Sequence, residues 1–181
     1  MKSSTDIERL KEKVSRAFIK GDVILASGKK SNFYFDCRMV TLDQEGAHLA
    51  AKAMLAEIRK LGATAVGGMS MGADPLVSTI GNVAFTQKIG LTLFYVRKEP
   101  KKHGTGKLIE GPGLSSEDRV VIVEDVTTTG GSSLKAVNAV RDEFGAKVLA
   151  VLTIVDRQEG AEAHLAGNGV KLISIFKAQD F

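Results

Sequence analysis

The sequence lacks the features that mark several special classes of protein. Its one cysteine, Cys37, cannot form an internal disulfide, so a reducing, cytoplasmic setting is expected. No apolar run approaches the length of about 18 residues that spans a bilayer. The polar residues 1–13 contain no hydrophobic segment typical of a signal peptide. Hydrophobic residues make up 44% and charged residues 25%, a balance that excludes disordered, collagen-like and disulfide-scaffold chains.

The chain has 181 residues without an internal repeat, low-complexity tract or linker, which predicts one domain spanning residues 1–181. Its net charge of +4 is concentrated in residues 97–107, where five basic side chains face one acid, Glu99. The rest of the chain carries equal numbers of basic and acidic residues. This pattern argues against a nucleic-acid-binding protein and for one local positive segment.

Apolar runs alternate with helical periods from residue 66 onward, which predicts an α/β fold with a mainly parallel sheet flanked by helices. Expected helices cover residues 7–18, 47–61, 74–84 and 134–144; expected strands cover 23–26, 33–35, 64–66, 91–96, 120–123, 148–155 and 170–175. Gly21 and Gly62 are expected to cap the first two helices, and Asp74 to start the third. Residues 97–118 predict a loop longer than about 15 residues, a length that is usually functional.

The most informative segment is residues 120–132. A β-branched run typical of a strand buried on both faces ends in Glu124 and Asp125. Three threonines, two glycines and Ser132 follow and lead into a helix. Ligands of open α/β sheets bind outside the carboxyl ends of the strands, and a helix N-terminus with free N–H groups attracts anions. The segment therefore predicts a phosphate-binding loop.

The two acids restrict the kind of ligand that the loop can bind. No Walker A sequence and no G-x-G-x-x-G occurs, so the loop is not one of the common nucleotide-binding motifs. Carboxylates repel phosphate, so Glu124 and Asp125 must face another part of the same ligand, such as sugar hydroxyls or a bound divalent cation. A ribose 5-phosphate group fits this pattern. The competing interpretation is a capped strand-to-helix turn with surface acids.

Residues 120–132 resemble the phosphoribosyl-diphosphate binding motif of the type I phosphoribosyltransferases. Residues 25–36, which read LASGKKSNFYFD, resemble the N-terminal signature of the orotate phosphoribosyltransferases, and residues 97–104, RKEPKKHG, resemble the mobile catalytic loop of that family. The three segments lie in the family's order. The resemblance implies a type I phosphoribosyltransferase-like core with a small N-terminal hood formed by about residues 1–40.

The implied reaction transfers the 5-phosphoribosyl group from 5-phosphoribosyl 1-diphosphate to N1 of orotate, giving orotidine 5′-monophosphate and diphosphate in pyrimidine biosynthesis. By resemblance, the catalytic residues are Lys101, His103 and Asp125. The donor-binding residues are Arg97, Lys98, Lys101, His103, Glu124, Asp125, Val126, Thr127, Thr128, Thr129, Gly130, Gly131 and Ser132. The orotate-binding residues are Tyr34, Phe35, Thr128 and Arg157.

Several of these positions also have plainer interpretations. Tyr34 and Phe35 could be a core aromatic pair, and Arg157 could be a surface arginine paired with Asp156 or Glu159. Residues 67–72 could be a second anion-binding turn or a tightly packed strand-to-helix turn. The resemblance further implies Mg²⁺, which the substrate itself would largely hold, and a homodimer in which Lys101 and His103 reach the neighbouring site.

Two other functions remain open from the sequence. One is a phosphoribosyltransferase for another base, against which residues 27–36 and Arg157 argue. The other is a regulator that uses the same fold to sense the ribose donor and binds nucleic acid. Against it stand the intact basic loop and a chain too short for a full additional module.

Overall fold

The computed structural model describes residues 5–24, 30–100 and 107–181. Its centre is a six-stranded sheet in the order β5-β4-β3-β6-β7-β8. The strands are β3 (Ala65–Met69), β4 (Thr92–Val96), β5 (Ile109–Glu110), β6 (Arg119–Thr127), β7 (Lys147–Asp156) and β8 (Lys171–Lys177). All neighbours pair in parallel except β5, which is antiparallel to β4. The predicted α/β fold with a mainly parallel sheet is confirmed.

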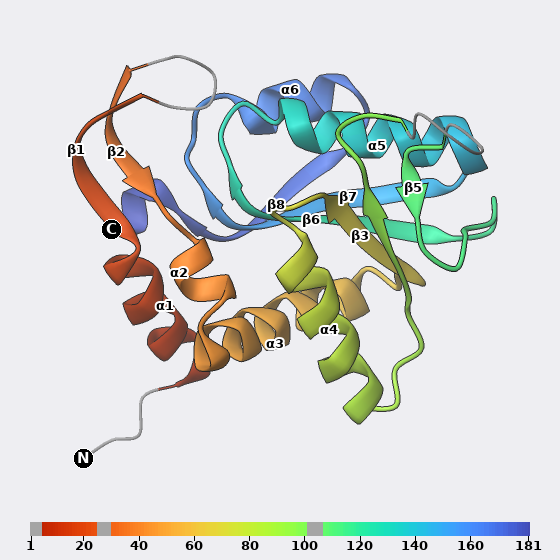
Figure 1. The fold of residues 1–181 in the computed structure, drawn as a ribbon, viewed down its shortest axis with the longest axis horizontal. Coiled ribbons are helices and arrows are strands. Elements are labelled where there is room, and N and C mark those ends of the chain that lie inside the picture. Colours follow the sequence, from red (N-terminus) through yellow and green to blue (C-terminus); the bar gives the residue numbers. More distant parts are fainter. Residues whose placement is uncertain (1–4, 25–29, 101–106) are drawn as a thin grey trace.

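Helices cover both faces of the sheet (Figure 1). On one side lie α3 (Gln44–Lys60) and α4 (Asp74–Thr86); on the other lie α5 (Gly131–Phe144) and α6 (Ala161–Gly167). The central strand β6 contributes to both apolar cores because alternate residues of a strand point to opposite faces. Val121 and Val123 join the α3–α4 core, and Val120 and Ile122 join the α5–α6 core.

The N-terminal part stands beside one end of the sheet (Figure 1). It consists of α1 (Asp6–Arg16), the antiparallel hairpin β1 (Phe18–Ile24) with β2 (Lys30–Phe35), and the short helix α2 (Arg38–Thr41). Helix α1 begins with a capping box in which Thr5 and Glu8 bond to each other's backbone N–H groups. The buried Leu10 and Val14 tie α1 to the α3–α4 core.

The first predicted helix ends two residues too late, and its predicted cap is wrong. Helix α1 ends at Arg16, and Phe18 begins strand β1, where its ring packs 4.9 Å from that of Phe35. Gly21 lies inside β1, with φ of 142°, at an irregularity in the pairing with β2. Helical spacing of apolar residues continued across the helix end, so periodicity alone could not locate the boundary.

Residues 67–72 are only partly a turn. Gly67 and Gly68 are the buried third and fourth residues of β3. Neither position has room for a side chain, because a Cβ at Gly67 would lie 2.5 Å from Phe94 and one at Gly68 would lie 2.3 Å from the Val123 carbonyl oxygen. The tight-packing interpretation therefore holds for these two glycines. Asp74 is the first residue of α4 and its N-cap is Ala73; the Asp74 carboxylate accepts a hydrogen bond from Ser70 Oγ at 2.9 Å.

The other predicted helices and strands differ from the observed ones mostly in where they begin and end. Gly62 follows α3 in the left-handed region, with φ of 67°, as expected of a residue just past a helix end. Helices α2 and α6 and the two-residue strand β5 were not anticipated, since each is too short to show a period. None of the helices in the described part of the chain has the length and apolar character required to cross a bilayer.

Candidate active site

The predicted phosphate loop lies at the carboxyl edge of the sheet, where β6 passes into α5. Strand β6 ends at Thr127, and Gly130 is the N-cap of α5 in the left-handed conformation, with φ of 78°. Glycine adopts this conformation without the steric cost that a Cβ would add. The first N–H groups of a 14-residue helix therefore open beside the end of a buried strand.

Glu124 is buried, with 5% of its surface exposed, and points toward the start of α5. One of its carboxylate oxygens accepts hydrogen bonds from Ser132 Oγ at 3.3 Å and Ser133 Oγ at 3.1 Å. Burial, with a smaller contribution from the neighbouring Asp125 charge, raises the pKa of Glu124 to about 8. Glu124 therefore carries a proton over much of the neutral range and can donate as well as accept a hydrogen bond.

Asp125 points to the opposite side of β6, toward the N-terminal part. Its Oδ1 accepts a hydrogen bond from the Val126 N–H at 2.7 Å. Burial raises the pKa of Asp125, and this hydrogen bond and, to a smaller extent, the Arg38 guanidinium oppose that rise. Arg38 itself forms an ion pair with Asp36 at 2.8 Å. The two acids thus flank the end of the strand from both faces, rather than lying side by side.

The loop after the acids presents a graded exposure. Thr127 is 2% exposed; its hydroxyl has no hydrogen-bond partner among the described residues, and its carbonyl accepts from the Arg157 N–H at 2.9 Å. Thr128 is half-buried, Thr129 is exposed, and the Ser132 side chain lies on the first turn of α5. The sequence places four hydroxyls here, and the structure turns that of Thr127 inward.

The positive segment begins at the end of β4. Arg97 and Lys98 are exposed and, with Glu99, Ser70 and Met71, line a cleft of about 490 Å³. Arg97 also forms an ion pair with Glu110 at 3.4 Å. The turn between β3 and α4 therefore faces the basic end of β4 across an open space. Lys101 and His103 lie outside the described residues.

Arg157 is a buried arginine rather than a surface one. Only 3% of it is exposed, and its Nη2 donates to Ser31 Oγ at 2.9 Å and to the Phe33 carbonyl at 3.1 Å. The same nitrogen lies 2.7 Å from Glu159, as the plainer interpretation anticipated, and the guanidinium stacks 4.5 Å from the centre of the Phe33 ring. Its Nε is buried without a partner among the described residues. Arg157 joins the end of β7 to the hairpin.

The two predicted orotate aromatics face different ways, as alternate residues of a strand must. Phe35 is 2% exposed and packs among Phe18, Phe33 and Phe181. Tyr34 is half-buried on the other side of β2. The core interpretation therefore describes the ring of Phe35, whereas Tyr34 is available at the surface of the hairpin.

Two residues that shape the site were missed from the sequence. Ser133 holds Glu124 from the first turn of α5, and Arg38 acts electrostatically on Asp125. A signal existed for Ser133, since it is a second hydroxyl directly after Ser132. The effect of Arg38 on Asp125 depends on a contact between distant segments, which spacing along the chain does not reveal.

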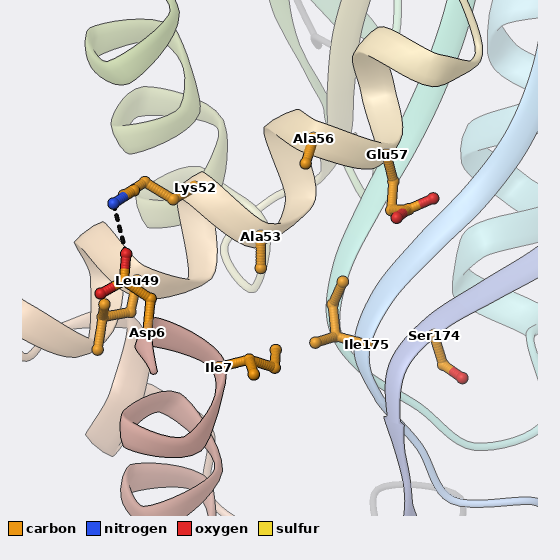
Figure 2. A pocket seen from close by; sticks show the side chains of 9 residues that line it. All are labelled: Asp6, Ile7, Leu49, Lys52, Ala53, Ala56, Glu57, Ser174 and Ile175. Carbon is orange, nitrogen blue, oxygen red and sulfur yellow. Dashed lines mark hydrogen bonds and ion pairs between the residues drawn. The ribbon is translucent and has the colours of Figure 1, made fainter. Parts of the chain in front are cut away.

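A second cleft lies away from these groups, between α1, α3 and β8 (Figure 2). It has a volume of about 430 Å³ and is lined largely by apolar side chains, with Ile7 and Ile175 pointing toward each other. Lys52, the cation in its lining, is bound to Asp6 at 2.5 Å. This cleft offers no free positive charge to a phosphate. In the part of the chain that the structure describes, no three His, Cys, Asp or Glu side chains group to hold a metal ion.

A buried strand that ends in two acids, followed by a glycine-capped helix N-terminus, defines the class of the type I phosphoribosyltransferases. An orotate phosphoribosyltransferase of Rhodopseudomonas palustris (strain BisB5) is 45% identical over 170 residues, covering 92% of this chain and 90% of the relative. The chain belongs to the orotate phosphoribosyltransferase family. No protein-family model matches it.

Solved structures agree with this assignment. A phosphoribosyltransferase from Corynebacterium diphtheriae superposes with a TM-score of 0.83 at 33% identity, covering 98% of both chains. An orotate phosphoribosyltransferase of Mycobacterium tuberculosis H37Rv, in complex with 5-phospho-α-D-ribosyl 1-diphosphate, gives 0.79 at 32% identity, covering 97% of this chain and 98% of the other. The resemblance inferred from three sequence segments is thereby confirmed over nearly the whole chain.

Proposed function

We infer that this protein is an orotate phosphoribosyltransferase. It transfers the 5-phosphoribosyl group from 5-phosphoribosyl 1-diphosphate to N1 of orotate, giving orotidine 5′-monophosphate and diphosphate in de novo pyrimidine biosynthesis. The observation that carries this function is the junction of β6 and α5, where Glu124 and Asp125 adjoin a helix N-terminus capped by Gly130. The relative solved with the diphosphate donor supports the same ligand class.

The reaction breaks the bond between C1 of the ribose and the diphosphate oxygen, and forms a bond from C1 to N1 of orotate. Positive charge develops on the ribose and negative charge on the departing diphosphate, so the protein acts by positioning and by charge stabilisation. In this proposal Asp125 and Glu124 bind the ribose hydroxyls. The backbone of residues 126–131, with the hydroxyls of Thr128, Thr129 and Ser132, binds the 5′-phosphate. Thr127 contributes through its backbone, since its hydroxyl is buried.

The basic segment takes the diphosphate. Arg97 and Lys98 are exposed beside the cleft that faces Ser70 and Met71, which suits a polyanion entering from solvent. Lys101 and His103 continue this segment in the sequence, and we propose that they complete the diphosphate site.

The orotate end is formed by the hairpin and the end of β7. Tyr34 offers an accessible aromatic face, Phe35 supports the hairpin from the core, and Thr128 lies on the same edge of the sheet. The buried Arg157 carries a guanidinium whose Nε has no partner among the described residues, and a guanidinium suits the carboxylate of orotate. Together these groups would select orotate over a base without a carboxylate.

Mg²⁺ is proposed as the metal of the donor complex. The fit rests on the donor set: Asp125 is a carboxylate at the open end of β6, and no cluster of three metal-ligating side chains occurs among the described residues. Such a set suits a cation that the substrate's own oxygens largely coordinate, with Asp125 as the protein ligand. When bound, the cation neutralises charge on the diphosphate.

The functional unit is proposed to be a homodimer in which Lys101 and His103 act in the neighbouring site. Large exposed apolar side chains stand near the catalytic edge, namely Met39 and Leu42 at α2 and Met71 at the β3–α4 turn, with 58%, 72% and 79% of their surfaces exposed. A dimer interface that covered these three side chains would remove apolar surface from water. We further propose one domain for residues 1–181 and a cytoplasmic location, which the buried free thiol of Cys37 suits.

The decisive experiment measures orotate consumption with the diphosphate donor, with and without Mg²⁺. Adenine, hypoxanthine and uracil serve as competing bases. Turnover of one of these bases faster than orotate would identify a different phosphoribosyltransferase. Salt-sensitive nucleic-acid binding without diphosphate release would favour a regulator.

Sharing of the site is tested by mixing two inactive variants, Asp125→Asn and Lys101→Ala. If Lys101 acts in the partner's site, a heterodimer contains one site with both native residues, and activity partly returns. A verified heterodimer without recovered activity would show that each subunit works alone.

A further inference from the structure

His164, a residue that the proposed mechanism does not use, contacts the phosphate loop from α6. Its Nδ1 lies 2.8 Å from the carbonyl oxygen of Thr129, 35 residues earlier in the chain. A carbonyl oxygen can only accept a hydrogen bond, so Nδ1 must carry the hydrogen and donate it. The ring of His164 is therefore fixed in orientation by a loop residue rather than free in solvent.

This hydrogen bond fixes more than one group, because a peptide bond is planar and trans. The carbonyl of Thr129 and the N–H of Gly130 belong to the same peptide unit and point in opposite directions. Holding the carbonyl toward α6 turns the Gly130 N–H away from α6. That N–H lies at the N-cap of α5, where backbone donors are available to an anion.

Helix α6 also packs against the loop at Gly130 itself. A Cβ on Gly130 would lie 3.2 Å from Leu165 Cγ and 3.4 Å from Ala161, both fully buried residues of α6. Gly130 therefore lies in direct contact with the helix that carries His164. Helix α6 therefore holds the loop at two neighbouring residues, by apolar contact at Gly130 and by a hydrogen bond at Thr129.

We propose that His164 is a positioning residue for the phosphate loop: its Nδ1–H holds the Thr129 carbonyl and thereby aims the Gly130 N–H at the 5′-phosphate. This rests on the proposed function, since it assigns the phosphate to the loop at the start of α5. The role needs a donor at the place of Nδ1. It needs no proton transfer, and His164 touches neither substrate.

The test compares three replacements of His164. The amide nitrogen of asparagine can occupy the place of Nδ1, whereas that of glutamine reaches further out and alanine offers no donor. We expect His164→Ala and His164→Gln to raise KM for the diphosphate donor roughly threefold to tenfold, the factor for one lost hydrogen bond. KM for orotate should stay unchanged, and His164→Asn should remain within about twofold of the native protein.

A direct readout is the backbone amide of Gly130 in ¹⁵N-labelled protein. Its resonance should shift in His164→Ala and His164→Gln and return toward the native position in His164→Asn. The matched control is His48→Ala, since His48 is an exposed histidine on α3; it should leave KM, the Gly130 resonance and the melting temperature unchanged. Equal melting temperatures of the three His164 variants would show that the effect is local.

The proposal is overturned if His164→Ala binds the donor as the native protein does, or if His164→Asn loses as much affinity as His164→Ala. Calorimetry with inorganic phosphate separates this result from failure of the proposed function. A native protein that does not convert orotate, yet loses phosphate affinity on His164→Ala and regains it on His164→Asn, would refute the function and support the positioning role.

Discussion

The buried carboxyl of Glu124 makes the stability of the protein depend on pH in a way that one substitution should remove. Burial raises its pKa from 4.5 to about 8, so the folded protein binds this proton more tightly than the unfolded chain does. The stability associated with the protonated carboxyl is fully present below pH 4.5, and it is lost as the pH rises through about 8. Glutamine at this position has similar size and no charge, and it can still accept from Ser132 and Ser133.

The size of the effect follows from the two pKa values. One pKa unit corresponds to about 1.4 kcal/mol, so ionisation of Glu124 should cost the native protein about 4 kcal/mol of unfolding free energy between pH 5 and pH 9. Glu124→Gln should not show this loss. At about 2–4 °C per kcal/mol for a chain of this length, the melting temperatures of the two proteins should diverge by roughly 10 °C.

The assay is thermal or urea unfolding of both proteins at several pH values, read as the difference between them so that other groups cancel. Glu162→Gln, at an exposed position on α6, is the matched control and should follow the native protein. Parallel curves for the native protein and Glu124→Gln from pH 5 to pH 9 would refute the argument that burial raises this pKa.

Three further substitutions test the site. Asp125→Asn should lower kcat/KM about a hundredfold without lowering the melting temperature, since it removes a buried charge that in the proposed mechanism binds the ribose; near-native rates would remove Asp125 from the mechanism. Gly130→Ala should lower the free energy of unfolding in urea by about 1–2 kcal/mol, because φ is 78° there. The control Gly167→Ala, where a Cβ would meet nothing within 4 Å, should leave stability unchanged or raise it. Equal effects of the two substitutions would contradict backbone strain at position 130. Glu159→Gln should lower KM for orotate roughly threefold, because a carboxylate no longer competes for Arg157, and should lower stability; a raised KM would show that Glu159 instead orients the arginine.

The parts of the fold that could be predicted are those with strong local signals. Local patterns locate these elements without reference to distant residues. They are the β-branched run in β6, the long apolar stripe of α3, and the glycines that follow α3 and α5. The loop at 124–132 is local in the same sense: strand, acids, hydroxyls, glycines and helix follow one another directly. This continuity explains why its position in the structure agrees with the sequence.

The parts that could not be predicted depend on which segments meet. Phe35 and Tyr34 are adjacent in the sequence, yet only the packing of Phe18 and Phe181 decides that the ring of Phe35 is buried. The sequence left residues 67–72 open between an anion-binding turn and a tightly packed one, and only the neighbouring strands show that Gly67 and Gly68 are glycines for lack of space. Long-range packing, rather than local conformational preference, sets these roles.

Both ends of the candidate site contact residues 157–164, which run from the end of β7 into α6. Arg157 fixes the hairpin through Ser31 and Phe33, and its N–H fixes the Thr127 carbonyl, while His164 fixes that of Thr129. The proposed orotate end and the proposed phosphate end are therefore both held by this one segment. Since a displacement reaction requires N1 of the base at a set distance from C1 of the ribose, this shared support explains how two loops far apart in the sequence can hold one reacting geometry.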